Sequence, residues 1–222
     1  ATDRQRPNVT FFVLALAGTS YAFLQSLVAP ALPDMQHALH TSENAVSWVL
    51  TAYLLSASVA TPLIGRLGDI YGKERLLVIV LALLSVGTVV SALSSSIGPM
   101  LVGRVLQGAA GGIFPLAFGI IRDEFPREKV APRIGLMSAL LGVGGGAGVV
   151  LAGPIVDNLS IHYLFWVPLI PIVAATVATY FVVPESPVRA RAGVNWAAAL
   201  LMSIGLSAVL IAVSETATWH WL

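Results

Sequence analysis

Residues 65–75 read Gly-Arg-Leu-Gly-Asp-Ile-Tyr-Gly-Lys-Glu-Arg, a charged segment between two long apolar stretches at residues 46–64 and 76–95. Glycine is the residue that most readily adopts the backbone conformations of a sharp turn. Because Gly65 and Gly72 bracket the segment, we expect a tight turn that joins two helices. The apolar stretches on both sides then predict that these helices lie in a membrane.

Composition supports a membrane protein. The 222 residues are 10% charged and 57% hydrophobic, whereas soluble proteins are about 25% charged. So few charges exclude an ordinary soluble enzyme and a disordered chain. The net charge of +1 argues against a nucleic-acid partner, which requires a basic face. Without cysteine, there is no disulfide framework and no thiolate metal site.

Apolar runs of about 20 residues are long enough to cross a bilayer as helices. Seven such runs are separated by short segments that carry most of the charges. They comprise residues 9–32, 46–64, 76–95, 99–121, 134–156, 163–183 and 195–214. The first run is too long for a cleavable signal peptide. We therefore predict seven spans: a six-helix domain at residues 1–186, then a linker and seventh span at residues 187–222.

Basic residues predict the orientation, because loops rich in Lys and Arg stay on the cytoplasmic side. Eleven of the twelve lie in the N-terminal segment or in the connections that follow the second, fourth and sixth spans. We expect a multi-pass protein of the bacterial cytoplasmic membrane with its N-terminus inside. The eleven are Arg4, Arg6, Arg66, Lys73, Arg75, Arg122, Arg127, Lys129, Arg133, Arg189 and Arg191.

An odd number of spans leaves two interpretations open. One is a seven-helix receptor, retinal protein or scaffold, although a retinal protein needs a lysine within a span and Lys73 and Lys129 both lie in loops. The other is the front part of a longer transporter, whose remaining half lies outside these residues.

Residues 65–75 resemble the signature loop of the major facilitator superfamily, G-x-L-x-D-x-x-G-[RK]-x-[RK], at every key position. The resemblance implies that Asp69 docks onto the second half of the transporter and stabilises its outward-open state. It also implies that Lys73 and Arg75 anchor the loop by pairing with Asp123 or Glu124.

Residues 101–108 are similar to the family's fourth-span motif, whose R-x-x-Q-G core is matched by Arg104, Gln107 and Gly108. Arg104 and Gln107 are three residues apart and share a helix face. A charge within a span costs at least ~2.5 kcal/mol, so Arg104 should face a cavity or a partner, or extend to the outer interface. In proton-coupled members this arginine is implicated in proton transfer. Because arginine keeps its proton, it would tune an acid or bind an anionic group.

The fifth span is rich in glycine, and small residues let membrane helices approach closely. Gly144 and Gly148 form a small-xxx-small pair and resemble the family's antiporter motif imperfectly, with Val149 in place of proline. We expect Pro154 to kink or end this helix. Gly153-x-x-x-Asp157 also echoes Gly65-x-x-x-Asp69, as an inverted three-plus-three repeat would.

The short linker before the seventh predicted span resembles the one in the fourteen-helix drug:proton antiporters of this family. The first span, however, departs from the pattern of that branch. Leu24 stands where that branch carries an acid, and Ala29 where it carries asparagine. No Asp or Glu lies in the middle of any predicted span. A coupling acid would therefore lie beyond these residues, unless coupling is absent or uses another ion.

The resemblance implies an all-α membrane protein: the six-helix N-terminal bundle of the major facilitator fold, built as a 3+3 inverted repeat, plus one additional helix. It would export amphipathic organic compounds by alternating access, in exchange for protons. Alternatives are a transporter for a lipid, metabolite or siderophore, not necessarily proton-coupled, and a seven-helix protein without transport activity. We expect no enzyme activity, cofactor or metal. The cavity candidates are Gln25, Ser26, Tyr53, Arg104, Gln107 and Met137.

Overall fold

The computed structural model describes residues 7–185 and 196–214, and the regular secondary structure of this part of the chain is helical. Its elements are α1 (Pro7–Val28), α2 (Leu32–Ala38), α3 (Glu43–Tyr71), α4 (Lys73–Ala92), α5 (Ile97–Gly108), the 3₁₀ turn η1 (Ala109–Gly112), α6 (Ile113–Glu124), α7 (Arg127–Asn158), α8 (Tyr163–Val182) and α9 (Trp196–Ser214).

Six helical stretches within the described residues are long and apolar enough to cross a membrane. They are α1, α3, α4, the continuous stretch Ile97–Glu124, α7 and α8. Their positions confirm the first six predicted helices. The seventh predicted helix forms as α9, which packs against α3. The predicted domain boundary at residues 186 and 187 falls outside the described residues.

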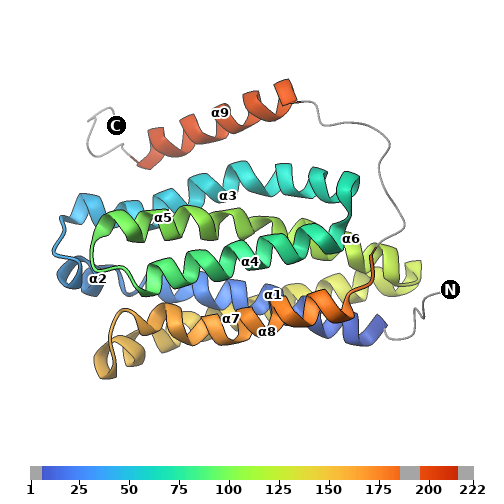
Figure 1. Cartoon of the computed structure of the whole chain (residues 1–222), viewed down its shortest axis with the longest axis horizontal. Coiled ribbons are helices and arrows are strands. Elements are labelled where there is room, and N and C mark those ends of the chain that lie inside the picture. Colours follow the sequence, from blue (N-terminus) through green and yellow to red (C-terminus); the bar gives the residue numbers. More distant parts are fainter. Residues whose placement is uncertain (1–6, 186–195, 215–222) are drawn as a thin grey trace.

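Connections alternate between the two ends of the bundle (Figure 1). The start of α1, the α3–α4 turn, the α6–α7 connection and the end of α8 all lie at one end. We call this the basic end, because it carries Arg66, Lys73, Arg75, Arg122, Arg127, Lys129 and Arg133. Arg4, Arg6, Arg189 and Arg191 lie outside the described residues.

The signature turn is shorter than the sequence predicted. Helix α3 continues to Tyr71, and only Gly72 separates it from α4. Gly72 has φ +113°, a conformation that L side chains rarely adopt, and its N–H donates to the Gly68 carbonyl oxygen at 3.0 Å. The prediction for Gly65 was wrong: it lies inside α3, where a Cβ would stand 3.3 Å from the Pro115 Cβ. It allows α3 to approach α6 closely.

Pro154 does not end its helix, because α7 continues to Asn158. The side chain of Asn158 donates to the Pro154 carbonyl oxygen at 2.8 Å, which satisfies an acceptor in the last turn.

The packing partners show the internal repeat. Helix α1 packs mainly on α7 and α8, and α5 packs mainly on α3 and α4. The first three spans are α1, α3 and α4, and the second three are α5 with α6, α7 and α8. If each span of the first set is exchanged with its counterpart in the second, the contacts of α1 become the contacts of α5. This is the arrangement expected of an inverted three-plus-three repeat.

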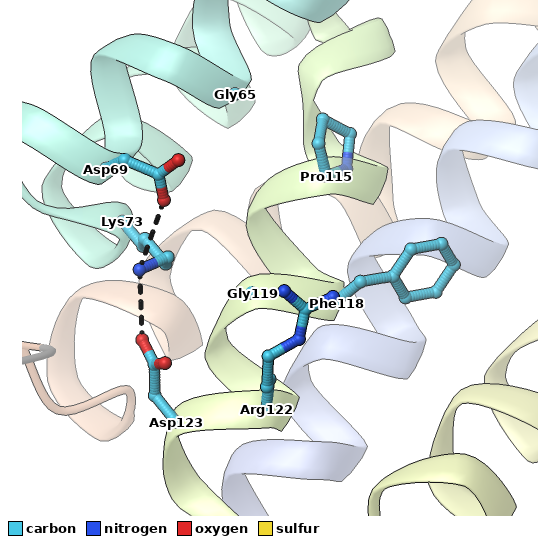
Figure 2. Close-up of a pocket in the computed structure, with 8 residues that line it drawn as sticks. All are labelled: Gly65, Asp69, Lys73, Pro115, Phe118, Gly119, Arg122 and Asp123. Carbon is cyan, nitrogen blue, oxygen red and sulfur yellow. Dashed lines mark hydrogen bonds and ion pairs between the residues drawn. The ribbon is translucent and has the colours of Figure 1, made fainter. Parts of the chain in front are cut away.

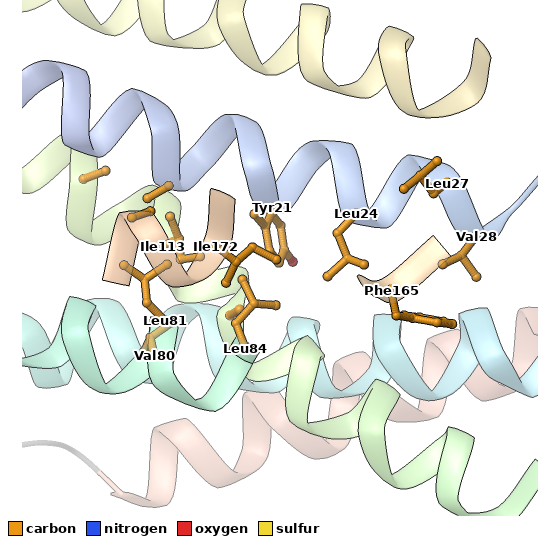
Figure 3. Packing of buried hydrophobic residues seen from close by; sticks show 14 of the residues in the cluster. Tyr21, Leu24, Leu27, Val28, Val80, Leu81, Leu84, Ile113, Phe165 and Ile172 are labelled. Atoms are coloured by element: carbon orange, nitrogen blue, oxygen red, sulfur yellow. The ribbon is translucent and has the colours of Figure 1, made fainter. Parts of the chain in front are cut away.

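Buried apolar side chains fill the space between α1, α4, α6 and α8 (Figure 3). Leu24 is fully buried there, in the company of Leu27, Leu84 and Phe165. The position at which the drug:proton antiporters carry an acid therefore belongs to the apolar core in this chain.

Two sets of glycines on α7 have different surroundings. A Cβ on Gly144 or Gly148 would lie 2.7 Å from the carbonyl oxygen of Thr19 or Phe23 in α1, respectively. Gly142, Gly146 and Gly153 have no atom of the described chain within 4 Å of the equivalent point. The first pair, unlike the second set, therefore allows the backbones of α1 and α7 to approach each other.

We predict that Gly148→Ala lowers the free energy of unfolding by about 1–3 kcal/mol, because the backbone of α1 cannot move aside without repacking. Gly146→Ala is the matched control and should be neutral or stabilising by up to about 1 kcal/mol. Thermal unfolding in detergent measures both. Equal destabilisation by the two variants would contradict the assignment of the contact face.

Candidate functional site

Arg104 lies at the centre of a polar cluster and is fully buried. Its Nε donates to the Val49 carbonyl oxygen of α3 at 3.0 Å, and its Nη2 donates to Gln25 Oε1 of α1 at 2.8 Å. Its Nη1 donates to Gln107 Oε1 at 2.5 Å. The side chain therefore turns into the protein, which excludes the alternative that it extends to the outer interface.

An aromatic ring covers the guanidinium. The Tyr53 ring centroid lies 4.6 Å from its central carbon, a cation–π contact. The Tyr21 and Tyr53 hydroxyls are hydrogen-bonded to each other. Tyr21 also meets Phe114 of α6 edge to face at 5.4 Å. The Tyr53 ring thus borders the charge, and Tyr21 and Phe114 extend the aromatic contacts to α1 and α6.

Gln107 extends the cluster to α4. Its Nε2 donates to Ser91 Oγ at 3.2 Å and reaches Thr88 Oγ1 at 3.5 Å. Helices α4 and α5 approach closely here because Gly103 has no side chain. A Cβ at this position would lie only 2.7 Å from the Gly87 carbonyl oxygen. The Arg104 cluster, as we call it from here, comprises Tyr21, Gln25, Val49, Tyr53, Thr88, Ser91, Arg104 and Gln107.

The structure brings four of the six predicted cavity residues together: Gln25, Tyr53, Arg104 and Gln107. It places Ser26 and Met137 elsewhere, in the contact between α1 and α7. Met137 is fully buried with its methyl group against Gly18, and Ser26 lies against Gly148. Packing, rather than a cavity, accounts for these two.

Sequence reasoning missed Tyr21, Thr88 and Ser91. Tyr21 precedes Gln25 by four residues, and Thr88 precedes Ser91 by three. These spacings place each pair on one helix face. Polar pairs on one face of an apolar span are a signal that could have found them.

The signature turn forms a second polar site, at the basic end. Lys73 Nζ lies 3.0 Å from Asp123 Oδ2 and 3.3 Å from Asp69 Oδ1, and so bridges the two carboxylates (Figure 2). The lysine side chain is 9% exposed, Asp123 is 12% exposed and Asp69 is 46% exposed. The lysine stem crosses Gly119, where a Cβ would stand 2.7 Å from its Cε.

A pocket of about 450 Å³ opens beside these charges. We call it the signature pocket; its lining residues are Gly65, Asp69, Lys73, Pro115, Phe118, Gly119, Arg122 and Asp123. The half-exposed Asp69 carboxylate stands at this pocket, where it can accept further hydrogen bonds from a ligand or a second protein segment.

Arg75 was expected to pair with Asp123 or Glu124, and this prediction was wrong. Its Nε lies 3.2 Å from Glu185 Oε1, and its Nη2 lies 3.4 Å from Glu185 Oε2. Glu185 follows the end of α8, so the contact joins the first turn of α4 to the last span of the bundle. Among the residues that the structure describes, no group of three or more His, Asp or Glu side chains could hold a metal ion.

Residues 14–222 match the family model of the Major Facilitator Superfamily. The chain belongs to this family. It is 29% identical over 220 residues to the tetracenomycin C resistance and export protein of Streptomyces glaucescens, covering 98% of this chain and 41% of that protein. It is also 29% identical over 212 residues to the uridine/deoxyuridine transporter of Lactococcus lactis, covering 93% of this chain and 44% of that protein.

Solved structures agree on the fold. An autoinhibited peptide transporter of the POT family superposes with a TM-score of 0.72 at 18% identity, over 85% of this chain and 39% of the other. The chain thus spans less than half the length of these relatives. These relatives are membrane transporters and not enzymes, and membership of their family decides against a seven-helix receptor.

The two ion pairs of the signature turn should differ in their contribution to stability. Lys73→Met leaves two facing carboxylates, of which Asp123 is mostly buried, and should cost about 3 kcal/mol. Arg75→Met breaks a pair whose arginine is 66% exposed and should cost less than about 1 kcal/mol, because water screens it. Thermal unfolding of both variants in detergent checks this ranking, and a larger loss for Arg75→Met would refute it.

Proposed function

We propose that this chain is the first six-helix bundle, with the first additional helix, of a longer transporter that exports amphipathic organic compounds by alternating access. The carrying observation is the signature pocket, where Asp69 is half-exposed beside an open space. A second bundle is the natural partner for that carboxylate. On this proposal the basic end faces the cytoplasm, as the distribution of Lys and Arg favours.

We further propose that export is coupled to proton entry. Every Asp and Glu of the described chain lies near a helix end or in a connection. The coupling carboxylate would therefore belong to the part of the transporter outside this chain. The export protein of Streptomyces glaucescens supports the direction of transport.

Transport assays on the full-length transporter in liposomes test both parts of this proposal. The probes share one ring system and differ in charge: 1-naphthamide, 1-naphthoate and 1-naphthylmethylammonium. We expect efflux of at least one probe, accelerated by an imposed pH gradient and slowed when nigericin dissipates it. Efflux that is independent of the pH gradient would contradict proton coupling. Absence of efflux for all three probes would contradict the proposed substrate class.

A second candidate is transport of a small polar metabolite, which the Lactococcus lactis relative favours at a similar identity. Radiolabelled uridine in the same liposomes separates the candidates. Saturable uridine transport without efflux of any naphthyl probe would favour this second function.

The role of Asp69 in switching gives a further prediction. Asp69→Asn keeps the shape of the side chain but weakens charge-assisted hydrogen bonds across the pocket. We expect the ratio of outward-open to inward-open molecules to fall about fivefold, equivalent to ~1 kcal/mol. Distances between spin labels on the two bundles report this ratio.

Asp157→Asn is the matched control, because Asp157 is an exposed carboxylate near the end of α7, at the opposite end of the bundle. It should leave the distance distribution unchanged. Equal shifts in the two variants would show that Asp69 has no special part in the switch.

A further inference from the structure

The Arg104 cluster contains a buried positive charge that the described chain does not neutralise. The three hydrogen bonds from Arg104 end on a backbone carbonyl and two amide oxygens, all of them neutral. None of the ion pairs among the described residues includes Arg104. Arginine keeps its charge at any accessible pH, so the cluster carries a net charge of +1.

By sequence position, no carboxylate of the described chain lies in the middle of a span. They are Asp34, Glu43, Asp69, Glu74, Asp123, Glu124, Glu128, Asp157 and Glu185, which lie near helix ends or in connections. Burying a cation without a counter-ion is strongly unfavourable. Such an arrangement is expected where a negative ligand completes the site.

Unused hydrogen-bond donors accompany the unpaired charge. A guanidinium has five N–H donors, and three of them make the hydrogen bonds described above. Gln25 Nε2 is buried and has no hydrogen-bond partner among the described residues. Because Gln25 Oε1 accepts from Arg104, the amide nitrogen lies next to the guanidinium. Both groups offer hydrogens, and only an acceptor satisfies them.

Within the Arg104 cluster, Gln25 and Tyr53 are the two residues that are partly exposed, whereas Arg104 is completely buried. Both contact the guanidinium, so a ligand that reaches Arg104 is expected to pass these two side chains. The Tyr53 ring, with Tyr21 and then Phe114 packed beyond it, supplies aromatic surface next to the charge, which suits the body of an amphipathic molecule.

We propose that the transporter selects organic anions and that Arg104 and Gln25 together hold the substrate's carboxylate or sulfonate group. The carboxylate accepts hydrogen bonds from the free guanidinium N–H groups and from Gln25 Nε2, while the aromatic rings contact its apolar part. The same charge repels organic cations. This inference rests on the proposed export function and adds the charge class of the substrate.

Binding of three probes to the full-length transporter in nanodiscs tests the charge preference. The probes are 1-naphthoate, 1-naphthamide and 1-naphthylmethylammonium, measured by calorimetry at neutral pH. We expect wild type to bind the anion at least about tenfold more tightly than the cation. Equal affinity for anion and cation, or tighter binding of the cation, overturns the inference.

Gln25→Glu is the decisive variant, because it supplies the missing counter-ion with almost no change in shape. A glutamate at this position can form an ion pair with Arg104, which should stabilise the fold while it neutralises the site. We expect the anion preference to fall about tenfold or more while affinity for 1-naphthamide changes little. An unchanged preference in this variant overturns the inference.

Arg104→Lys and Arg104→Gln separate charge from shape. The lysine variant should retain the preference for the anion, and the glutamine variant should lose it. Arg133→Gln is the matched control, because Arg133 also stacks on aromatic rings, 4.8 Å from Phe11 and 5.1 Å from Phe125, but lies at the basic end. It should leave the preference intact.

The outcomes distinguish this inference from the proposed function. If wild type exports 1-naphthamide but does not prefer the anion, export stands and the charge selectivity is wrong. If 1-naphthoate does not bind at all, the selectivity is wrong as well, and the pH-gradient assay then decides whether export survives. An acid supplied to Arg104 by another part of the transporter would appear as equal probe affinities, which is again the contradicting result.

Discussion

Arg104 makes the hydrogen bonds on which the centre of the bundle depends. Through the Val49 carbonyl oxygen it connects to α3, through Gln25 to α1, and through Gln107 to Ser91 and Thr88 of α4. A single buried cation thus joins the first three spans to the fourth. In an apolar surrounding each of these hydrogen bonds is hard to replace, so the register between the two three-helix repeats is tied to one side chain.

Close helix approach makes this network feasible. Gly87 and Gly103 bring α4 and α5 together beside Ser91, and Gly144 and Gly148 bring α7 against α1. Because lipid supplies no hydrophobic force between helices, association relies on close packing and interhelical hydrogen bonds. The glycines and the polar cluster therefore contribute together to holding the helices against one another.

Much of the fold could be predicted because a span must be long and apolar, and because i, i+3 spacing brought Arg104 and Gln107 onto one face. The partners of Arg104 in α1 and of Arg75 after α8 are 79 and 110 residues away, and no local pattern encodes such contacts. Gly65 was misread because a glycine that allows helices to touch looks, in sequence, like one that permits a turn. The signature residues also extend α3 beyond its apolar run, so the end of hydrophobicity did not mark the end of the helix.

Leu24 and Gln25 are neighbours in α1, but their side chains lie in different surroundings. Neighbouring residues on a helix point about 100° apart, and here Leu24 enters the apolar core while Gln25 meets the guanidinium. An acid at residue 24 would be fully buried within the apolar core. Residue 25 is thus the position in α1 that decides whether the cluster is positive or neutral. An amide there orients Arg104 without neutralising it, so the charge remains available to a ligand.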